Sequence, residues 1–462
     1  TPLYSSAASD VYKRQAEDRF VLVNSEFVGL YQAIAGHLTT VEKTLLLTDA
    51  PEKTAELPNL VGEYETLLAA AGPQYAFEDF DENSVATTFY TTGTTGNPKG
   101  VYFTHRQLVL HTLGVSTIMG AIDSVRLLGT NDVYMPITPM FHVHAWGLPY
   151  VATMLGLKQV YPGRYDPEYL VELWRREKVT FSHCVPTILQ MVLNAKAAQG
   201  TDFGGWKIVI GGSALNRALY EAAKAKGIQL TAAYGMSETG PLVSCAHLND
   251  ELMAGSEDER TTYRIKAGVP GPLVEAAIID AEGNFLPADG EAQGELVLRA
   301  PWLSEGYFNE PQKGAELWEG GWLHTGDVAT LDSMGVIDIR DRIKDVIKTG
   351  GEWISSLDLE DLISRHAAVR EVAVVGIADP QWGERPFALL VIREGHEIGA
   401  RELKEHLKPF VELGHLSKWA IPSQIALVTE IPKTSVGKLD KKRIRVDISE
   451  WQASNSTFLS TL

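Results

Sequence analysis

The stretch Thr91-Thr92-Gly93-Thr94-Thr95-Gly96-Asn97-Pro98-Lys99-Gly100 decides how the rest of the chain is interpreted. It follows Val85-Ala86-Thr87-Thr88-Phe89-Tyr90, whose branched and aromatic side chains are typical of a strand. Glycines let backbone N–H groups approach an anion closely, threonine hydroxyls donate further hydrogen bonds, and Lys99 supplies a mobile positive charge. The stretch therefore predicts a phosphate-binding loop, and a flexible polar turn is the alternative.

This loop is not a Walker A motif, because that motif requires Gly-Lys followed by Ser or Thr, whereas Lys99 lies between Pro98 and Gly100. With four segments downstream, it resembles the adenylate-forming superfamily of acyl-CoA synthetases, luciferases and peptide-synthetase adenylation domains. These segments are 234–240 (YGMSETG), 321–327 (GWLHTGD), 341–345 (DRIKD) and 432–438 (PKTSVGK). Residues 350–356 (GGEWISS) narrow the resemblance to fatty acyl-CoA synthetases.

The resemblance implies an α/β fold with a large α/β domain of several subdomains, one of them β-rich, and a small mobile α+β C-terminal domain. We expect the large domain at residues 16–343, with the ATP and acyl sites, and the small domain at 344–462, with a catalytic lysine. Family members carry further strands and helices before the point where residue 16 aligns, and residues 1–15 match no family element. We therefore expect a fragment with a non-native amino end, whose truncation uncovers strand edges and apolar surface.

The hydrophobic pattern agrees with this layout. Short apolar runs alternate with helical stretches between residues 21 and 235, as an α/β layer requires, and strand-and-turn spacing follows residue 267. The predicted strands include 133–137, 159–161, 180–183, 207–210, 228–233, 275–280, 294–299, 372–377 and 387–392. The predicted helices include 104–119, 167–177 and 401–411.

Composition limits the partners. The 462 residues include 41 Lys and Arg against 59 Asp and Glu, a net charge of −18, which disfavours nucleic acid and requires local positive charge for anionic substrates. Neither Cys184 nor Cys245 has a metal-ligand spacing, so a reducing cytoplasm is expected. No apolar run reaches the roughly 18 residues of a membrane span. A peripheral membrane contact with a lipid substrate and a homodimer remain open options.

The resemblance implies that a carboxylic acid attacks ATP to give an acyl-adenylate and pyrophosphate, and that coenzyme A then takes the acyl group. Catalysis would rest on positioning and electrostatic stabilisation. Glu238 and Thr91 would hold Mg²⁺, which accepts one or two protein oxygens beside phosphate and water; a solvated surface carboxylate is the alternative for Glu238. The predicted phosphate ligands are Thr91, Thr92, Gly93, Thr94, Thr95, Gly96 and Lys99.

Asp327 resembles the residue that accepts both ribose hydroxyls, although a Gly-Asp pair alone is more typical of a turn. Arg342 would contact the same ribose, and Tyr234 would stack on adenine. Residues predicted to line the nucleotide pocket are Gly212, Ser213, Ala214, Gly235 and Ser237. His142 and Trp146 are predicted near ATP and the acyl site, with ordinary core packing as the alternative.

Lys438 is the predicted adenylation lysine, because its ammonium could reach both the attacking carboxylate and the α-phosphate. The alternative is a solvated lysine, since the basic run at 441–443 follows it. Lys344 lies in the segment that resembles the hinge of the small domain. Lys348 and Trp353 are expected close to the active site, where Trp353 either gates an acyl tunnel or is simply a packed aromatic.

Three function classes follow. The first is an ATP-dependent acid–CoA ligase for medium- or long-chain fatty acids, with a short methylthio-alkanoate as the second choice of substrate. The second is an adenylation enzyme that transfers its product to a carrier protein. The third is a protein that binds nucleotide without turnover, which the presence of Lys438, Glu238 and Asp327 disfavours.

Overall fold

The computed structural model describes residues 16–50, 56–91, 98–121, 127–434, 438–454 and 458–460. The chain divides into two compact units. Unit 1 comprises Thr1–Gln107 and Ser304–Glu316, and unit 2 comprises Leu108–Leu303 and Leu317–Leu462. The predicted non-native segment 1–15 lies outside the described residues.

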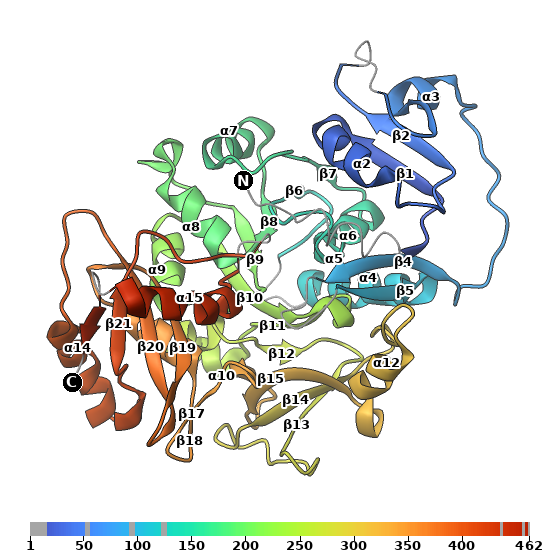
Figure 1. The fold of residues 1–462 in the computed structure, drawn as a ribbon. Helices are drawn as coiled ribbons and strands as arrows, with labels where there is room; N and C mark the ends of the chain where they lie inside the picture. Colours follow the sequence, from blue (N-terminus) through green and yellow to red (C-terminus); the bar gives the residue numbers. More distant parts are fainter. Residues whose placement is uncertain are drawn as a thin grey trace. The chain divides into compact units, whose positions relative to one another are not determined.

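Unit 1 contains a parallel three-stranded sheet, coloured blue in Figure 1. Its strands are β1 (Phe20–Asn24), β2 (Lys43–Leu47) and β3 (Leu60–Glu63), accompanied by helices α2 (Val28–Ala35) and α3 (Tyr64–Ala70). A small core of Val23, Tyr31, Ile34 and Leu46 joins α2 to the sheet. Phe20 and Leu22 of the outer strand β1 are each 52% exposed, so the face of β1 that is turned away from this core presents apolar side chains to solvent.

A separate antiparallel hairpin in unit 1 flanks the glycine-rich stretch. It pairs β4 (Val85–Thr91) with β5 (Lys99–Thr104), and Thr91 lies opposite Lys99. The strand predicted before the loop is therefore confirmed.

Unit 2 is built on a seven-stranded sheet in the order β12-β11-β10-β9-β8-β6-β7. The strands from β7 to β10 run parallel, and β11 and β12 are antiparallel. Their bounds are β6 (Val133–Pro136), β7 (Lys158–Gln159), β8 (Phe181–Cys184), β9 (Lys207–Ile210), β10 (Gln229–Gly235), β11 (Leu242–Cys245) and β12 (Val269–Pro270). Strand β7 ends before Val160 and Tyr161, so the predicted strand 159–161 is wrong at its carboxyl end.

Helices cover both faces of this sheet. Ile208 and Ile210 pack with α7 (Pro167–Glu177), α8 (Pro186–Asn194) and α9 (Arg217–Ala225). Val209, between them, packs on the opposite face with α4 (His105–Gly120) and α6 (Leu148–Met154). Because both faces are buried, the strands appear in the sequence as continuous apolar runs, which is why β9 could be predicted to the residue.

The region after residue 267 forms a four-stranded antiparallel sheet, which confirms the predicted β-rich subdomain. Its strands are β13 (Glu275–Ile279), β14 (Gly294–Arg299), β15 (Leu323–Leu331) and β16 (Ile337–Arg342).

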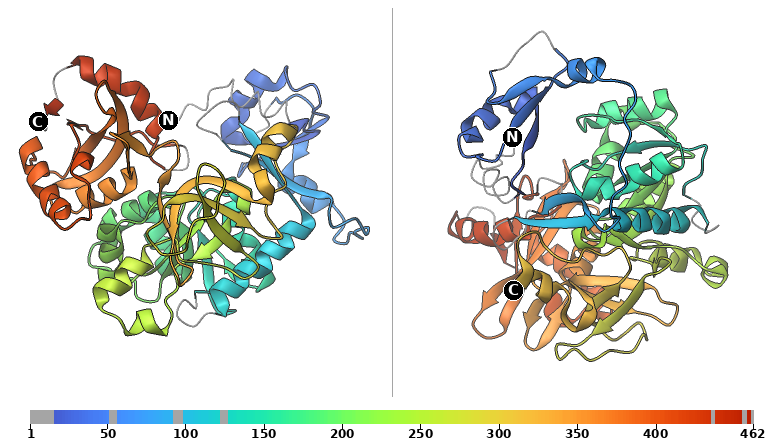
Figure 2. Two further views of the ribbon diagram at one scale, coloured as in Figure 1. Left: turned by 90° about the horizontal axis from the view of Figure 1, so that it is seen from below. Right: turned by 90° about the vertical axis from the view of Figure 1, so that its right-hand side faces the viewer.

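The carboxyl-terminal sheet is the α+β part that the sequence predicts. It contains β17 (Ile347–Thr349), β18 (Glu352–Ile354), β19 (Val369–Asp379), β20 (Gly383–Ile392), β21 (Gln424–Leu427) and β22 (Phe458–Ser460). Val372 and Val374 pack against α13 (Ser356–Ser364) and α14 (Ala400–Glu412), whereas Ala373 and Val375 pack with α15 (Lys441–Ser454). Successive side chains of β19 therefore point to opposite faces of the sheet, and each face is covered by helices, as Figure 2 shows.

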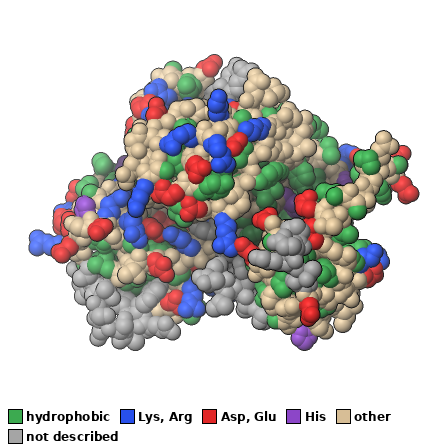
Figure 3. Space-filling view, turned by 90° about the horizontal axis from the view of Figure 1, so that it is seen from above, with side chains coloured by type: hydrophobic (Ala, Val, Ile, Leu, Met, Phe, Trp, Pro, Cys, Tyr) green, Lys and Arg blue, Asp and Glu red, His purple; other side chains and the backbone are tan. Residues whose placement is uncertain are grey.

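Surface charge is mixed despite the net charge of −18. On the face drawn in Figure 3, Lys and Arg side chains are interspersed with Asp and Glu. Among the described residues, no helix is both long and apolar enough to cross a membrane.

Candidate active site

The side chains of Tyr234, Asp327 and Arg342 meet in unit 2. The Tyr234 hydroxyl at the end of β10 donates to Asp327 Oδ2 at 2.6 Å. Arg342 Nε lies 3.3 Å from Asp327 Oδ1, because the two residues are directly opposite each other in the β15–β16 pair. Each carboxylate oxygen has about two acceptor positions, so Asp327 keeps one on each oxygen for a ligand with two adjacent hydroxyls.

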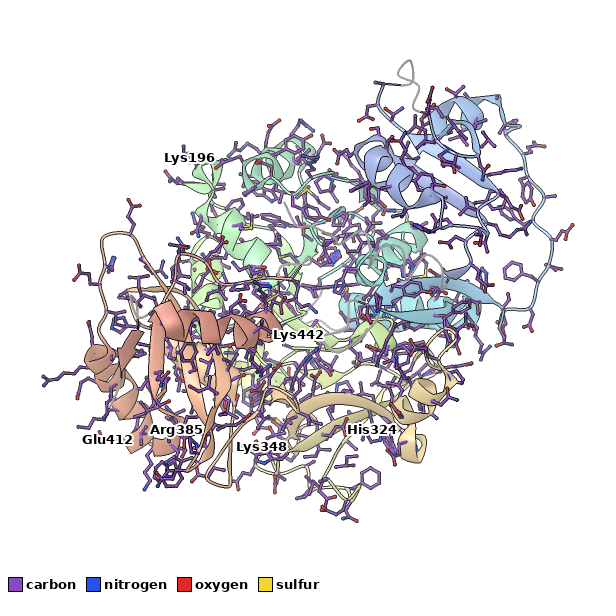
Figure 4. The ribbon with its side chains drawn as sticks, in the orientation of Figure 1. Lys196, His324, Lys348, Arg385, Glu412 and Lys442 are labelled. Carbon is purple, nitrogen blue, oxygen red and sulfur yellow. The ribbon has the colours of Figure 1, made fainter. Side chains whose placement is uncertain are left out.

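A neighbouring strand fixes the turn that carries Asp327. Glu295 of β14 accepts from Gly326 N through Oε1 at 2.9 Å and lies 3.0 Å from His324 Nδ1 through Oε2. Figure 4 labels His324 on this sheet. The Asp327 N–H donates to Thr325 Oγ1 at 3.1 Å. These contacts hold the backbone that leads into Asp327, and Tyr234 and Arg342 orient its carboxylate before any ligand binds.

Lys438 lies at the same place. A side chain added at Gly212 would come within 3.2 Å of Lys438 Cε, so the lysine passes directly over this glycine. The positive φ of 79° at Gly212 also favours glycine. The backbone of Lys438 is held by Thr434: Thr434 N donates to Lys438 O at 2.7 Å and Lys438 N donates to Thr434 Oγ1 at 3.2 Å.

The charges of Lys438, Asp327 and Arg342 shift one another's pKa values. Burial lowers the pKa of Lys438 to about 8, with the Arg342 charge acting in the same direction and Asp327 and Glu238 acting against it. Burial raises the pKa of Asp327, and the charges of Arg342, Lys438 and Lys344 oppose that rise. The site therefore contains a carboxylate and several cations. Their charges interact strongly with one another because solvent is partly excluded.

Neighbouring groups leave no room for a side chain at Gly211, which precedes Gly212. A side chain at Gly211 would lie 2.6 Å from the Ala233 carbonyl oxygen and 3.6 Å from Trp146 Cη2. Close approach of β10 therefore requires glycine there. The predicted residues Ser213 and Ala214 follow as exposed positions, and Gly235 and Ser237 are partly buried.

His142 and Trp146 flank an unusual turn. Residues 143–147 all have positive φ, between 48° and 70°, which is costly for residues other than glycine and above all for the branched Val143. Burial and the Lys438 charge lower the pKa of His142 to about 4, so its imidazole is neutral at pH 7. Trp146 is buried and makes an edge contact with His183 at 5.0 Å between ring centroids. Such strain is concentrated at functional sites, whereas Trp146 also belongs to a core cluster, so a role of these two residues near the substrates stays a prediction.

Glu238 lies in the short 3₁₀ turn Ser237–Thr239 and is buried. Asp327 and, more weakly, Glu238 raise the pKa of Arg342, and the Glu238 charge opposes the lowering of the Lys438 pKa, which places this carboxylate among the cations. No group of three or more His, Cys, Asp or Glu side chains that could hold a metal occurs in the described part of the chain. A single carboxylate fits Mg²⁺ where phosphate and water provide the other ligands.

Lys348 and Trp353 contact each other across the β17–β18 pair, with the ammonium 5.6 Å from the indole ring. Figure 4 labels Lys348 in this hairpin. Trp353 is half exposed, so it is not the packed core aromatic that was the alternative. The described contacts of these two residues do not include the Asp327 cluster.

The phosphate loop belongs to unit 1. Thr92, Gly93, Thr94, Thr95 and Gly96 lie outside the described residues. Thr91 and Lys99 are the last described strand residues on either side, and the Lys99 ammonium lies 4.5 Å from the centroid of the Tyr307 ring.

Two features were not predicted from the sequence. Glu295 supports the Asp327 turn from 31 residues away, and no local pattern indicates that contact. Lys441 does not face water as the basic run suggested, because its ammonium lies 2.8 Å from Glu360 Oε1 and both side chains are nearly buried. The neighbouring Lys442 and Arg443 are exposed as expected.

Comparison with known proteins identifies the family of this chain. The sequence model of the AMP-binding enzyme family matches residues 1–308, and that of the AMP-binding enzyme C-terminal domain matches 358–438. A long-chain-fatty-acid–CoA ligase of Thermus thermophilus is 41% identical over 93% of this chain and 76% of its own length. A 3-methylmercaptopropionyl-CoA ligase of Ruegeria pomeroyi is 37% identical over 93% of this chain and 78% of its own.

Solved structures show the same fold. The ATP-bound MatB from Rhodopseudomonas palustris superimposes with a TM-score of 0.80 over 97% of this chain and 82% of that chain, at 24% identity. The prediction of an adenylate-forming fold is thereby confirmed. With the family matches and close relatives above, the chain belongs to the AMP-binding enzyme family.

Proposed function

We propose that this protein is an ATP-dependent acid–CoA ligase that forms an acyl-adenylate with release of pyrophosphate and then transfers the acyl group to coenzyme A. The observation that carries the proposal is the convergence of Lys438, Asp327 and Arg342 at Gly212. Relatives named fatty-acid–CoA ligases support medium- or long-chain acids as the substrate class. The relatives named 3-methylmercaptopropionyl-CoA ligases keep a short methylthio-alkanoate as the second candidate.

In the first half-reaction, a carboxylate oxygen attacks the α-phosphorus of ATP and the bond to the β-phosphate oxygen breaks. Asp327 accepts the two ribose hydroxyls, with Arg342 beside the same sugar, and Tyr234 lies against adenine. The Lys438 ammonium stabilises charge that develops between the carboxylate and the α-phosphate. The two adjacent acceptor oxygens of Asp327, held by Tyr234 and Arg342, support this assignment.

Glu238 and Thr91 would hold Mg²⁺, which would neutralise phosphate charge when bound. The cations around Glu238 also favour phosphate at this place. Residues 91–99 form the phosphate loop in this proposal, because the β4–β5 hairpin brings Thr91 and Lys99 opposite each other and leaves the glycine-rich segment between them.

In the second half-reaction, the coenzyme A thiol attacks the acyl carbon and AMP leaves. A swing of the small domain at Lys344 would withdraw Lys438 and bring Lys348 and Trp353 toward the site. The exposed aromatic ring of Trp353 supports a role outside the core, beside the acyl or pantetheine chain. The buried free thiols of Cys184 and Cys245 support a cytoplasmic location.

The adenylation rate should depend on pH through Lys438. Its pKa is lowered to about 8, and only the ammonium stabilises the developing charge. We expect kcat/KM for adenylation to be steady below pH 8 and to fall as pH rises through about 8. Pyrophosphate release measured from pH 6.5 to 9.5 tests this, with a profile that stays flat to pH 9.5 contradicting the role of Lys438.

One assay separates the three function classes. Pyrophosphate release is measured with acids of graded chain length, with either coenzyme A or a carrier protein as acceptor. We expect acid-dependent release and acyl-CoA formation. Transfer to the carrier protein alone would favour an adenylation module, and ATP binding without any release would indicate a nucleotide-binding protein.

A further inference from the structure

A buried carboxylate lies three residues before the proposed hinge. Asp341, at the end of β16, is 2% exposed. Its Oδ2 accepts from the Ser356 N–H at 2.6 Å, and its Oδ1 accepts from the N–H of the adjacent Arg342 at 2.8 Å. Ser356 is the first residue of α13, so the carboxylate lies at the positive end of that helix.

A lysine from the other end of the small domain completes the arrangement. Lys441 Nζ donates to Ser356 Oγ at 2.5 Å and lies 2.8 Å from Glu360 Oε1, and its charge also acts on Asp341. Lys441 begins α15 only three residues after Lys438. The network therefore connects the strand before the hinge with α13 and with the helix that follows the adenylation lysine.

The partners of Asp341 lie mostly on the other side of Lys344 in the chain. Apart from the adjacent Arg342 N–H, the described partners of the Asp341 carboxylate, Ser356 and Lys441, come after Lys344 in the chain. In the proposed hinge motion Asp341 would stay with β16 while both partners moved away. A carboxylate that loses the Ser356 donor and the nearby Lys441 charge is less well stabilised, so Asp341 favours the arrangement in which these partners are present. That arrangement is the one in which Lys438 lies over Gly212.

We propose that Asp341 is a positioning residue for the adenylation half-reaction: it latches the small domain in the arrangement that presents Lys438. This rests on the proposed function and on its hinge. Breaking the latch lowers the population of the adenylation arrangement and leaves the thiol step intact. Asp341 itself touches no nucleotide in this scheme.

The test compares the two half-reactions in Asp341→Ala. Adenylation is measured as acid-dependent exchange of labelled pyrophosphate into ATP. We expect its kcat to fall about tenfold or more, while KM for ATP changes less than about threefold. Thioester formation from supplied acyl-adenylate should stay within about twofold or increase. Equal losses in both half-reactions would overturn the proposal, because a merely structural role predicts them.

Two further variants sharpen this test. Ser356→Pro removes the donor on the far side of the hinge while proline remains acceptable at the first helical position, so it should give the same split and stands in if Asp341→Ala does not fold. Asp280→Ala is the control, because Asp280 follows β13 of the same sheet and, like Asp341, accepts from backbone N–H groups, those of Glu282 and Asn284, which both come before the hinge. It should change neither half-reaction more than about twofold.

A distance measurement tests the latch independently of catalytic activity. Spin labels on cysteines introduced at the exposed Glu251 and Lys442 report the separation of α10 (Asp250–Ala254) from α15; Lys442 is labelled in Figure 4. Asp341→Ala should broaden or shift this distance distribution, and Asp280→Ala should not. An unchanged distribution would overturn the latch. A parent chain that is inactive in both half-reactions would overturn the proposed function instead, and the distances would still decide the latch.

Discussion

Replacing Lys438 with alanine is expected to abolish acyl-adenylate formation and to spare thioester formation from supplied adenylate. Loss of one preorganised hydrogen-bond donor at a developing oxyanion already costs about 10²–10³-fold in kcat, and Lys438→Ala removes a full positive charge as well. The Lys438 ammonium lies over Gly212 and interacts with Asp327 and Glu238, so its loss removes positive charge from the reacting centre. Rapid-quench measurement of each half-reaction gives the two rates separately.

Lys442→Ala is the control for that experiment. It removes the same charge four residues later, at an exposed position of α15, and should leave both rates within about twofold. A comparable loss of both half-reactions in Lys438→Ala would show that the lysine does not act in adenylation alone.

The second large effect is expected for Asp327→Ala, which should lower kcat/KM for ATP by about 10²-fold, since hydrogen bonds to charged groups contribute about 1.5–3 kcal/mol each. The variant removes both oxygens of the proposed ribose acceptor and leaves the Tyr234 hydroxyl and the Arg342 guanidinium without this partner. Steady-state kinetics with varied ATP and calorimetric titration with ATP measure the loss.

Tyr234→Phe provides a graded comparison. It removes only the hydroxyl that fixes Asp327 Oδ2 at 2.6 Å, so we expect a loss of about three- to tenfold, near the value of one hydrogen bond. ATP affinity that is unchanged in Asp327→Ala would remove this residue from the nucleotide site.

The fold was largely predictable where a strand forms a short apolar run. Strand β9 (Lys207–Ile210) and strand β14 (Gly294–Arg299) match their predictions to the residue, because each contains three consecutive buried apolar residues. Strand β7 was predicted too long, because the exposed Tyr161 has the residue type of a strand but lies beyond the last paired residue.

The site was predictable only as far as its motifs extend along the chain. Asp327 and Arg342 occur in separate motifs, and the β15–β16 register brings them together. The supporting contacts of Glu295 and Asp341 depend on tertiary placement, since a carboxylate in a strand has no local pattern that names its partner. The left-handed turn at 143–147 was also unpredictable, because a segment rich in branched and aromatic residues favours ordinary backbone conformations.

Acid-dependent exchange of labelled pyrophosphate into ATP is the measurement on which the proposed chemistry depends. It requires that a carboxylic acid and ATP react reversibly at the cluster of Lys438, Asp327 and Arg342, and it needs no coenzyme A. We predict exchange that appears only when a fatty acid or methylthio-alkanoate is added and that is lost in Lys438→Ala. Absence of exchange with every acid, in a folded chain that binds ATP, would contradict adenylate formation by this protein.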